Sequence, residues 1–336
     1  MMCKVAINLA ALLVFLLLQV EARADMDTNH RFSTTVLCSP LIIGLDNTHL
    51  PLISVRVNDS VTATFLVDTG TNVLAVTDDF RRKMKLSLDA INQAGYSNTI
   101  SGQPAHTTTL AKLEIGKIVI NQQAVLVVPA GKLGGMERSV DGILGSNFFT
   151  QTALFWDFSQ HKMTFYILGN LNVQEVQSLG FSNISVFPIM PTPNYLWTTE
   201  ATVENASKVV KDTFVVDTGS VITRLASTDS YSLSLTPLKE NVQEWTYDRV
   251  QTLSTALVDK ITIGPTSLNN FSLYYSRQIG DLAPSTLGMD ILSGYKVLID
   301  FPAKKMYLQP NTPSMIITIK PQVAPLTQTP VPQTHP

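Results

Sequence analysis

Residues 65–71 read Phe-Leu-Val-Asp-Thr-Gly-Thr, and residues 214–220 read Phe-Val-Val-Asp-Thr-Gly-Ser. In both stretches an apolar run typical of a strand leads into Asp-Thr-Gly, and a residue with a hydroxyl group follows. The two aspartates, Asp68 and Asp217, lie 149 residues apart. This doubling predicts two equivalent strand-and-turn units, each of which delivers one carboxylate.

The similarity between the two halves extends beyond these stretches. The first half continues with Gly-Ile-Leu-Gly at residues 142–145, and the second continues with Thr-Leu-Gly at 286–288; the closing glycines lie 143 residues apart. Trp-Asp-Phe at 156–158 and Ile-Asp-Phe at 299–301 keep the same offset. A repeat whose landmarks recur in constant order indicates an internal duplication.

The composition is that of a globular protein with a substantial buried core. The 336 residues suffice for two domains of ordinary size, and 45% are hydrophobic whereas only 15% are charged. The net charge is −2 and no basic run stands out, which gives no support to a nucleic-acid partner. The five histidines are scattered without the spacing of metal ligands, so we predict no metal and no cofactor.

The first 24 residues have the pattern of a secretory signal peptide. Lys4 precedes an uncharged, leucine-rich run of 16 residues from Val5 to Val20, and Ala-Arg-Ala at 22–24 fits a cleavage site. We therefore expect a secreted or periplasmic protein that has no stable membrane association after cleavage. An uncleaved membrane anchor is the alternative, although the run is shorter than the roughly 20 residues that span a bilayer.

Local patterns divide the remaining chain into lobes and connecting segments. Strand-like runs rich in β-branched residues, such as Val61–Val67, dominate, whereas Thr77–Met84 reads as a short helix with Thr77 as its N-cap. We predict an all-β protein with a signal peptide at residues 1–24, an N-terminal extension at 25–49, a first lobe at 50–166, a linker at 167–184, a second lobe at 185–310 and a flexible tail, rich in Pro, Thr and Gln, at 311–336.

The duplicated carboxylates suit one kind of chemistry. If a pseudo-twofold axis relates the lobes, Asp68 and Asp217 meet across it, and two carboxylates in close contact share one proton. The ionised partner then accepts a proton from a bound water, while the protonated partner polarises a scissile carbonyl group. This arrangement predicts hydrolysis without a covalent enzyme intermediate.

The residues after each aspartate suit a supporting role. Gly70 and Gly219 leave room for a backbone to approach the carboxylate and for amide N–H groups to point at it. The hydroxyls of Thr69 and Thr218 can reach across the axis to the opposite loop and fix both turns. The segments 143–145 and 286–288 are predicted to be strands behind these turns.

Thr71 and Ser220 follow the two glycines, and their hydroxyls can hydrogen-bond the outer carboxylate oxygens. Such bonds favour the ionised form and lower a carboxyl pKa, whereas repulsion between the two charges raises the second titration. We therefore predict an acidic pH optimum, roughly pH 3–6. Asp157 and Asp300 are another matched pair, but each follows an apolar strand and precedes a turn, so we predict that they cap turns.

The chain resembles the aspartic peptidases of the pepsin and retropepsin type. The two Asp-Thr-Gly turns and the apolar segments that end in glycine carry the resemblance, which covers roughly residues 50–310 and is nearest to two retropepsin-like units in tandem. It implies a bilobal fold of two pseudo-symmetric, barrel-like lobes and a long cleft for an extended polypeptide substrate. Because both turns lie on one chain, it also implies that a monomer contains a complete site.

The resemblance further implies a β-hairpin flap over the cleft. In the first lobe the flap is expected near residues 95–104, with Ser101 and Gly102 at its tip. Tyr96 is the candidate aromatic residue that closes on the substrate, and packing on the protein surface is the alternative for it.

Three functions remain open from the sequence. An aspartic endopeptidase uses both aspartates and both flanking hydroxyl residues. A catalytically silent module would grip extended peptides in the same cleft by adding them as a strand, but it has no chemical need for these residues. The third alternative is a purely structural envelope protein.

Overall fold

The computed structural model describes residues 36–43, 50–90, 99–100, 103–104, 106–116, 118–128, 140–158, 162–167, 170–182, 184–194, 196–245, 250–278 and 283–311. The predicted signal peptide, the predicted tail beyond Asn311 and the flap candidates Tyr96, Ser101 and Gly102 lie outside these residues. Within the described part, no helix is long and apolar enough to cross a membrane.

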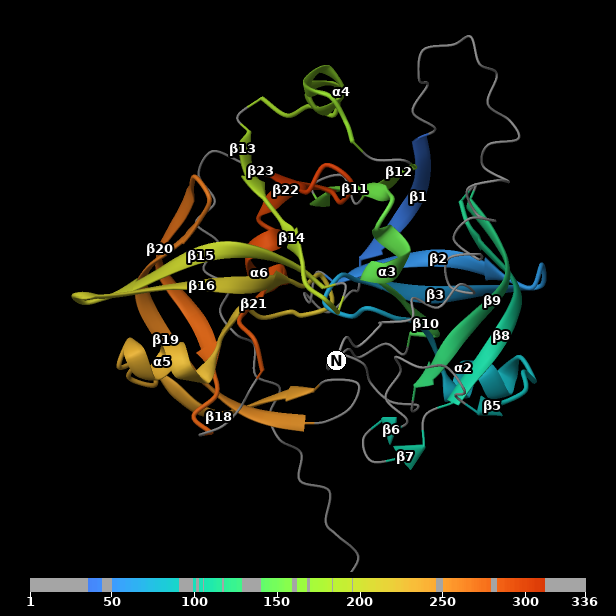
Figure 1. Ribbon diagram of the computed structural model, residues 1–336, viewed down its shortest axis with the longest axis horizontal. Coiled ribbons are helices and arrows are strands. Elements are labelled where there is room, and N and C mark those ends of the chain that lie inside the picture. Colours follow the sequence, from blue (N-terminus) through green and yellow to red (C-terminus); the bar gives the residue numbers. More distant parts are fainter. Residues whose placement is uncertain are drawn as a thin grey trace, which may run out of the picture.

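The first lobe is a closed β-barrel (Figure 1). Strand β2 pairs with both β3 and β8, so the sheet closes on itself and leaves no open edge in the ring. The ring runs β2 (Pro51–Val57), β3 (Val61–Asp68), β10 (Gly142–Gly145), β4 (Leu74–Thr77), β9 (Ile118–Val128) and β8 (His106–Ile115). Its other elements are α2 (Asp78–Lys83), β5 (Asp89–Ala90), β6 (Thr99–Ile100) and β7 (Gln103–Pro104).

The second lobe repeats this ring with the same order of corresponding strands. Strand β15 pairs with both β16 and β19 and thereby closes the barrel. The ring runs β15 (Trp197–Asn205), β16 (Lys208–Val216), β21 (Thr286–Leu287), β17 (Arg224–Leu225), β20 (Thr266–Tyr275) and β19 (Val250–Ile263). Its other elements are β14 (Met190–Pro191), α5 (Ser227–Ser232), β18 (Lys239–Trp245) and α6 (Met289–Leu292).

A sheet of six antiparallel strands joins the two lobes and lies above them in Figure 1. Its central pair, β11 and β22, comes from the two halves of the chain. The sheet runs β13 (Ser185–Pro188), β23 (Lys305–Pro310), β22 (Tyr295–Asp300), β11 (Thr152–Asp157), β12 (Lys162–Ile167) and β1 (Val36–Ile43). The predicted all-β, bilobal architecture is thus confirmed, and the predicted N-terminal extension contributes the strand β1.

Aromatic side chains from both halves pack between the lobes. Phe149, on the short helix α3 (Ser146–Phe149), stacks on Phe165 at 6.1 Å and on Phe301 at 6.0 Å between ring centroids. The ring of Trp197 meets Phe301 at 5.1 Å. Each of these rings is almost fully buried, and truncation of such a ring to alanine typically costs about 3–5 kcal/mol. This contact holds the two lobes against each other.

The predicted caps at Thr77 and Asp300 are confirmed, whereas the turn that follows Asp157 lies outside the described residues. Helix α2 begins after Thr77, whose side chain accepts the backbone N–H of Phe80 at 3.2 Å. Asp300 is fully buried and accepts the N–H of Ala303 in its own turn, and it also accepts the N–H groups of Asn170 and Leu171. The segment predicted as a linker is therefore tied to the interlobe sheet, and it contains helix α4 (Val173–Ser178).

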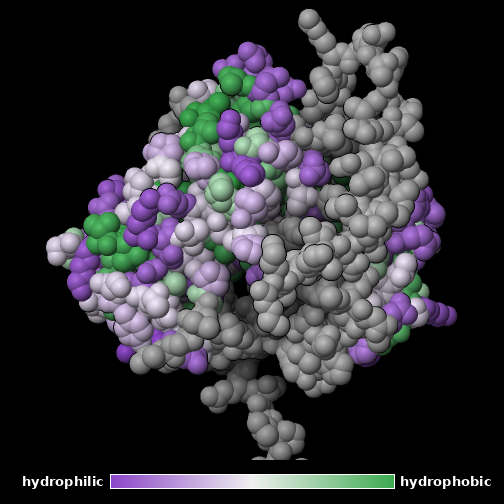
Figure 2. Space-filling model, in the orientation of Figure 1, coloured by the Kyte–Doolittle hydropathy of each residue, from purple (hydrophilic) through white to green (hydrophobic). Residues whose placement is uncertain are grey.

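On the face drawn in Figure 2, the hydrophobic side chains of the described residues lie in separate patches. That view shows separate hydrophobic patches (green) among hydrophilic side chains (purple) over the second lobe and the α4 region. Among the described residues the most exposed large hydrophobic side chains include Val173 on α4, Val209 on β16 and Leu238 just before β18, which are far apart in the sequence. Single exposed hydrophobic residues of this kind are common on protein surfaces.

Candidate active site

Each Asp-Thr-Gly turn lies where two parallel strands end together. Strand β10 pairs with β3 and places Gly145 beside Asp68, and β21 pairs with β16 and places Leu287 beside Val216. The predicted strands behind the turns are therefore confirmed. A Cβ on Gly145 would lie only 2.2 Å from the carbonyl oxygen of Val73, which explains why glycine ends this strand.

Two threonines lock the turns to each other. The Thr69 hydroxyl donates to the carbonyl of Val216 at 2.6 Å, and the Thr218 hydroxyl donates to the carbonyl of Val67 at 2.7 Å. Each threonine also donates its backbone N–H to the hydroxyl oxygen of the other at 3.1 Å. Both side chains are buried, so these bonds replace water and fix the turns, as predicted.

Each glycine of the turns faces the carboxyl group of the opposite lobe. A Cβ on Gly70 would lie 2.1 Å from Cγ of Asp217, and a Cβ on Gly219 would lie 2.3 Å from Cγ of Asp68. The N–H of each glycine donates to Oδ1 of its own aspartate, at 2.8 Å in both turns. The absence of side chains thus lets the two carboxyl groups meet at the lobe interface.

The surroundings of the carboxyl pair favour the protonated form of Asp68. The pKa of Asp68 is raised well above its ordinary value, first because the group is removed from water and then because the charge of Asp217 lies beside it. A hydrogen bond between the two side chains raises this pKa further, whereas the N–H groups of Gly70 and Thr71 oppose the shift. One neutral and one ionised carboxyl group side by side can act as acid and base together.

Thr71 and Ser220 do not act as predicted. From Thr71, the backbone N–H and not the hydroxyl donates to Oδ1 of Asp68, at 3.1 Å. The Ser220 hydroxyl donates to the carbonyl of Ile222 at 2.9 Å, so it is committed to its own loop. For Ser220, the prediction that its hydroxyl bonds an outer carboxylate oxygen is wrong, because the loop brings the Ile222 carbonyl within reach. For Thr71, the described bond to Asp68 comes from the backbone N–H.

Asp290, whose carboxyl group binds the end of the loop that starts at Asp217, was not identified from the sequence. Oδ2 of Asp290 accepts the N–H of Thr223 at 2.7 Å and Oδ1 accepts its hydroxyl at 2.6 Å. Burial raises the pKa of Asp290 to about 6, although its bonds with Thr223 act in the opposite direction. The signal in the sequence was the acidic residue two positions after Gly288, where the first repeat has Asn147.

The flap candidates stay predictions. Tyr96, Ser101 and Gly102 fall outside the described residues. The neighbouring strands β6 and β7 pair antiparallel, with Thr99 opposite Pro104 and Ile100 opposite Gln103.

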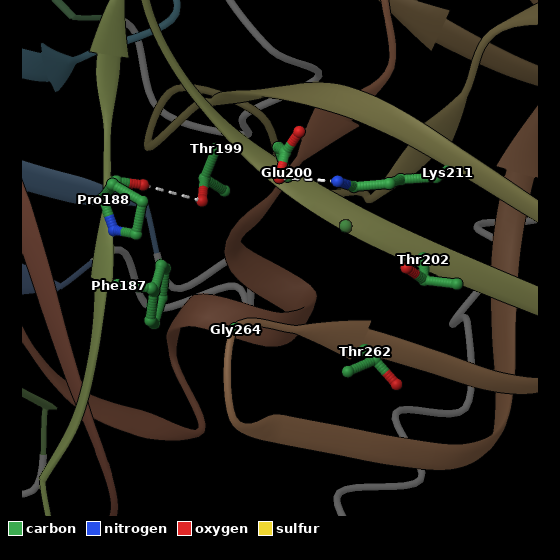
Figure 3. A pocket seen from close by; sticks show the side chains of 9 residues that line it. Phe187, Pro188, Thr199, Glu200, Thr202, Lys211, Thr262 and Gly264 are labelled. Carbon is green, nitrogen blue, oxygen red and sulfur yellow. Dashed lines mark hydrogen bonds and ion pairs between the residues drawn. The ribbon is translucent and has the colours of Figure 1, made fainter.

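A cavity of about 210 Å³ lies elsewhere, in the second lobe between β13, β15 and β19 (Figure 3). Its wall includes the Thr199 hydroxyl, which donates to the carbonyl of Pro188, and the exposed ion pair of Glu200 and Lys211 at 2.9 Å. No residue of the two catalytic turns lines it. Its volume is smaller than the roughly 300–1,000 Å³ of typical ligand pockets.

No group of three or more possible metal ligands occurs in the described residues.

A family model described as "Aspartyl protease" matches the chain twice, at residues 53–148 and 199–291. Together the matched regions span more than half of the 336 residues, and each contains one Asp-Thr-Gly turn. The chain belongs to the aspartyl protease family. The double match also agrees with the internal duplication that the sequence indicates, and it confirms the family resemblance.

A solved structure, the aspartic proteinase from Irpex lacteus, is similar to this aspartyl protease over 82% of the chain and 96% of its own length. The sequence identity is 16% and the TM-score is 0.47. No curated protein matches the chain.

Proposed function

We propose that this aspartyl protease is an endopeptidase that cleaves an extended polypeptide with a water molecule activated between Asp68 and Asp217. The apposition of the two carboxyl groups across the lobe interface carries the proposal. Each group lies against the glycine of the opposite turn, and burial together with the charge of Asp217 raises the pKa of Asp68. A silent peptide-binding module has no need for this arrangement.

The chemistry follows from the protonation of the pair. Burial and the charge of Asp217 raise the pKa of Asp68, so the pair shares one proton. The ionised carboxyl group accepts a proton from the attacking water. The neutral group donates its proton to the carbonyl oxygen as the water oxygen bonds to the carbonyl carbon, which gives a tetrahedral diol. The first group then returns its proton to the amide nitrogen while the second regains one from a diol hydroxyl, and the C–N bond breaks.

The surrounding turns keep this geometry fixed before the substrate arrives. The reciprocal bonds of Thr69 and Thr218, called the threonine lock below, fix the two loops relative to each other. The N–H groups of Gly70 and Gly219 stabilise the ionised form of their aspartates. Preorganised donors of this kind need no rearrangement during the reaction.

The proposal also covers the oligomeric state and the cellular location of the enzyme. Both catalytic turns lie on one chain, which supports an active monomer. The segment 1–24 supports export as a secreted or periplasmic protein, with no membrane attachment once the segment is removed.

The test is cleavage of a mixed peptide library by the purified chain starting at Asp25, across pH and with or without a statine-type inhibitor. We expect inhibitor-sensitive internal cleavage at acidic pH that declines as the pH rises through the raised pKa of Asp68, because the pair then loses its remaining proton. The matched control is Asp79→Asn, which changes an exposed aspartate on α2. Peptide retention without cleavage would instead support the silent binding module.

A further inference from the structure

The second catalytic loop, residues 217–223, is anchored at its far end by a carboxyl group that the reaction does not use. Asp290 accepts both the backbone N–H and the hydroxyl of Thr223, at 2.7 and 2.6 Å. The oxygen of that hydroxyl accepts the N–H of Gly288 at 3.1 Å. Thr223 is fully buried, so water cannot replace a bond that is lost.

The anchored segment is connected directly to Asp217. The N–H of Asp217 donates to the carbonyl of Leu287 at 3.0 Å, and the N–H of Met289 donates to the carbonyl of Ser220 at 2.8 Å. The segment 287–290 therefore contacts the catalytic loop at its beginning, middle and end. A shift at the Asp290 end is transmitted along both backbones to the carboxylate.

The first lobe has the backbone contacts but lacks the anchor. The N–H of Ser146 donates to the carbonyl of Thr71 at 2.7 Å, as Met289 does in the second lobe. At the positions of Thr223 and Asp290, however, the first lobe has Leu74 and Asn147. Leucine offers no hydroxyl, and Oδ1 of Asn147 has no hydrogen-bond partner among the described residues. Leu74 is instead buried among apolar neighbours.

We propose that Asp290 is a positioning residue that, through Thr223, holds the second catalytic loop so that Asp217 faces Asp68. The inference rests on the endopeptidase activity proposed above. At the position of Thr223 the first loop has the buried, apolar Leu74, whereas the second loop has the polar bonds to Asp290.

The kinetic test compares four variants. Asp290→Ala removes both acceptors, and we expect kcat to fall about 10- to 100-fold with KM changed less than about 3-fold, because misplacement of a reacting group mainly affects the chemical step. Asp290→Asn keeps an acceptor for the N–H of Thr223 and can donate to its hydroxyl oxygen, so it should stay within about 3-fold of the parent. Thr223→Val removes only the hydroxyl and should fall between the two. Asn147→Ala is the matched control and should leave kcat unchanged.

Amide hydrogen exchange separates positioning from a general loss of stability. In Asp290→Ala, exchange should rise in residues 217–223 and stay at the parent level in the corresponding residues 68–74. If Asp290→Ala does not fold, Thr223→Val takes its place in both measurements. A parent-like kcat, or an equal rise of exchange in both loops, overturns the proposal. If the parent itself cleaves nothing, the proposed function fails, whereas the exchange comparison still decides the role of Asp290.

Discussion

The two catalytic loops are alike where they meet and different where they are anchored. At the interface, the threonine lock and the bonds from glycine N–H groups have the same partners and nearly the same lengths in both lobes. Farther along, the second loop ends on the Thr223–Asp290 hydrogen bonds, whereas the first ends on buried Leu74.

This difference shows which parts of the repeat the chemistry constrains. Residues that face the axis must match, because each contacts its own counterpart in the other lobe. Farther along, Thr223 bonds Asp290 of its own lobe and Leu74 packs among apolar residues, so either a polar anchor or an apolar side chain can stand at this position. The substitutions below test both halves of that statement.

The largest effect is expected at the pair of Asp68 and Asp217, the dyad. Asp68→Asn and Asp217→Asn should each reduce kcat at least about 1,000-fold, because one carboxyl group cannot supply both the base and the acid. Circular dichroism and thermal unfolding should show that each variant is folded. Substantial activity in either variant, at equal protein quality, would contradict the shared mechanism.

The second-largest effect, a loss of folding stability, is expected at the threonine lock of Thr69 and Thr218. Thr69→Val leaves the Val216 carbonyl and the Thr218 N–H buried without partners, at about 1–3 kcal/mol for each group. Thr218→Val should lower the free energy of unfolding by a similar amount, and the double variant by less than the sum because the two residues share bonds.

The matched control for the lock is Thr108→Val. The Thr108 hydroxyl is equally buried but has no hydrogen-bond partner among the described residues, so its loss should be nearly neutral. Unequal losses from Thr69→Val and Thr218→Val in urea unfolding would show that the lock is not symmetric.

Asp290, which anchors the second loop, should make the stability of the protein depend on pH. The pKa of Asp290 is about 6 in the folded chain, above that of an unfolded aspartate, so the folded state binds this proton more tightly. The stabilisation is complete below about pH 4 and is lost as the pH rises through about 6. Asp290→Asn cannot lose a proton, so its stability relative to the parent should rise by up to roughly 3 kcal/mol between pH 4 and 7.5. Unfolding curves at both pH values check this, with Asp79→Asn as the control, which should show no such change.

The smallest effect is expected at Ser220. Its hydroxyl bonds Ile222 and not the dyad, so Ser220→Ala should cost about 1 kcal/mol of stability and leave the pH profile of kcat/KM in place. Thr71→Ala should leave it in place as well, because the donor to Asp68 is a backbone N–H. A shift of the profile in either variant would restore the tuning role that the sequence suggests for these hydroxyls.

The sequence predicted whatever depends on local pattern and on the repeat. The lobes, the dyad, the threonine lock and the strands behind the turns all follow from residues that recur in the same order in both halves of the chain. Asp300 was predicted to cap its turn, but its bonds to Asn170 and Leu171 come from a distant segment.

The contacts that the sequence did not predict depend on how distant segments of the backbone come together in the folded chain, and no local pattern of residues shows this. The direction of the Ser220 hydroxyl follows from the position of the Ile222 carbonyl, which only the folded loop defines. Asp290 and Thr223 lie 67 residues apart, and their pairing breaks the symmetry from which the site was inferred. The strand β1 is the last strand of the interlobe sheet and pairs with β12, more than 100 residues away in the sequence.

Titration of the active sites with a tight-binding, statine-type inhibitor tests most directly whether the two lobes of one chain form one catalytic site. With the chain starting at Asp25, cleavage should fall linearly to zero at one equivalent of inhibitor per chain, and activity per mole should not change on dilution. An end point at half an equivalent per chain, or cleavage that persists at saturating inhibitor, would contradict a single site built from Asp68 and Asp217.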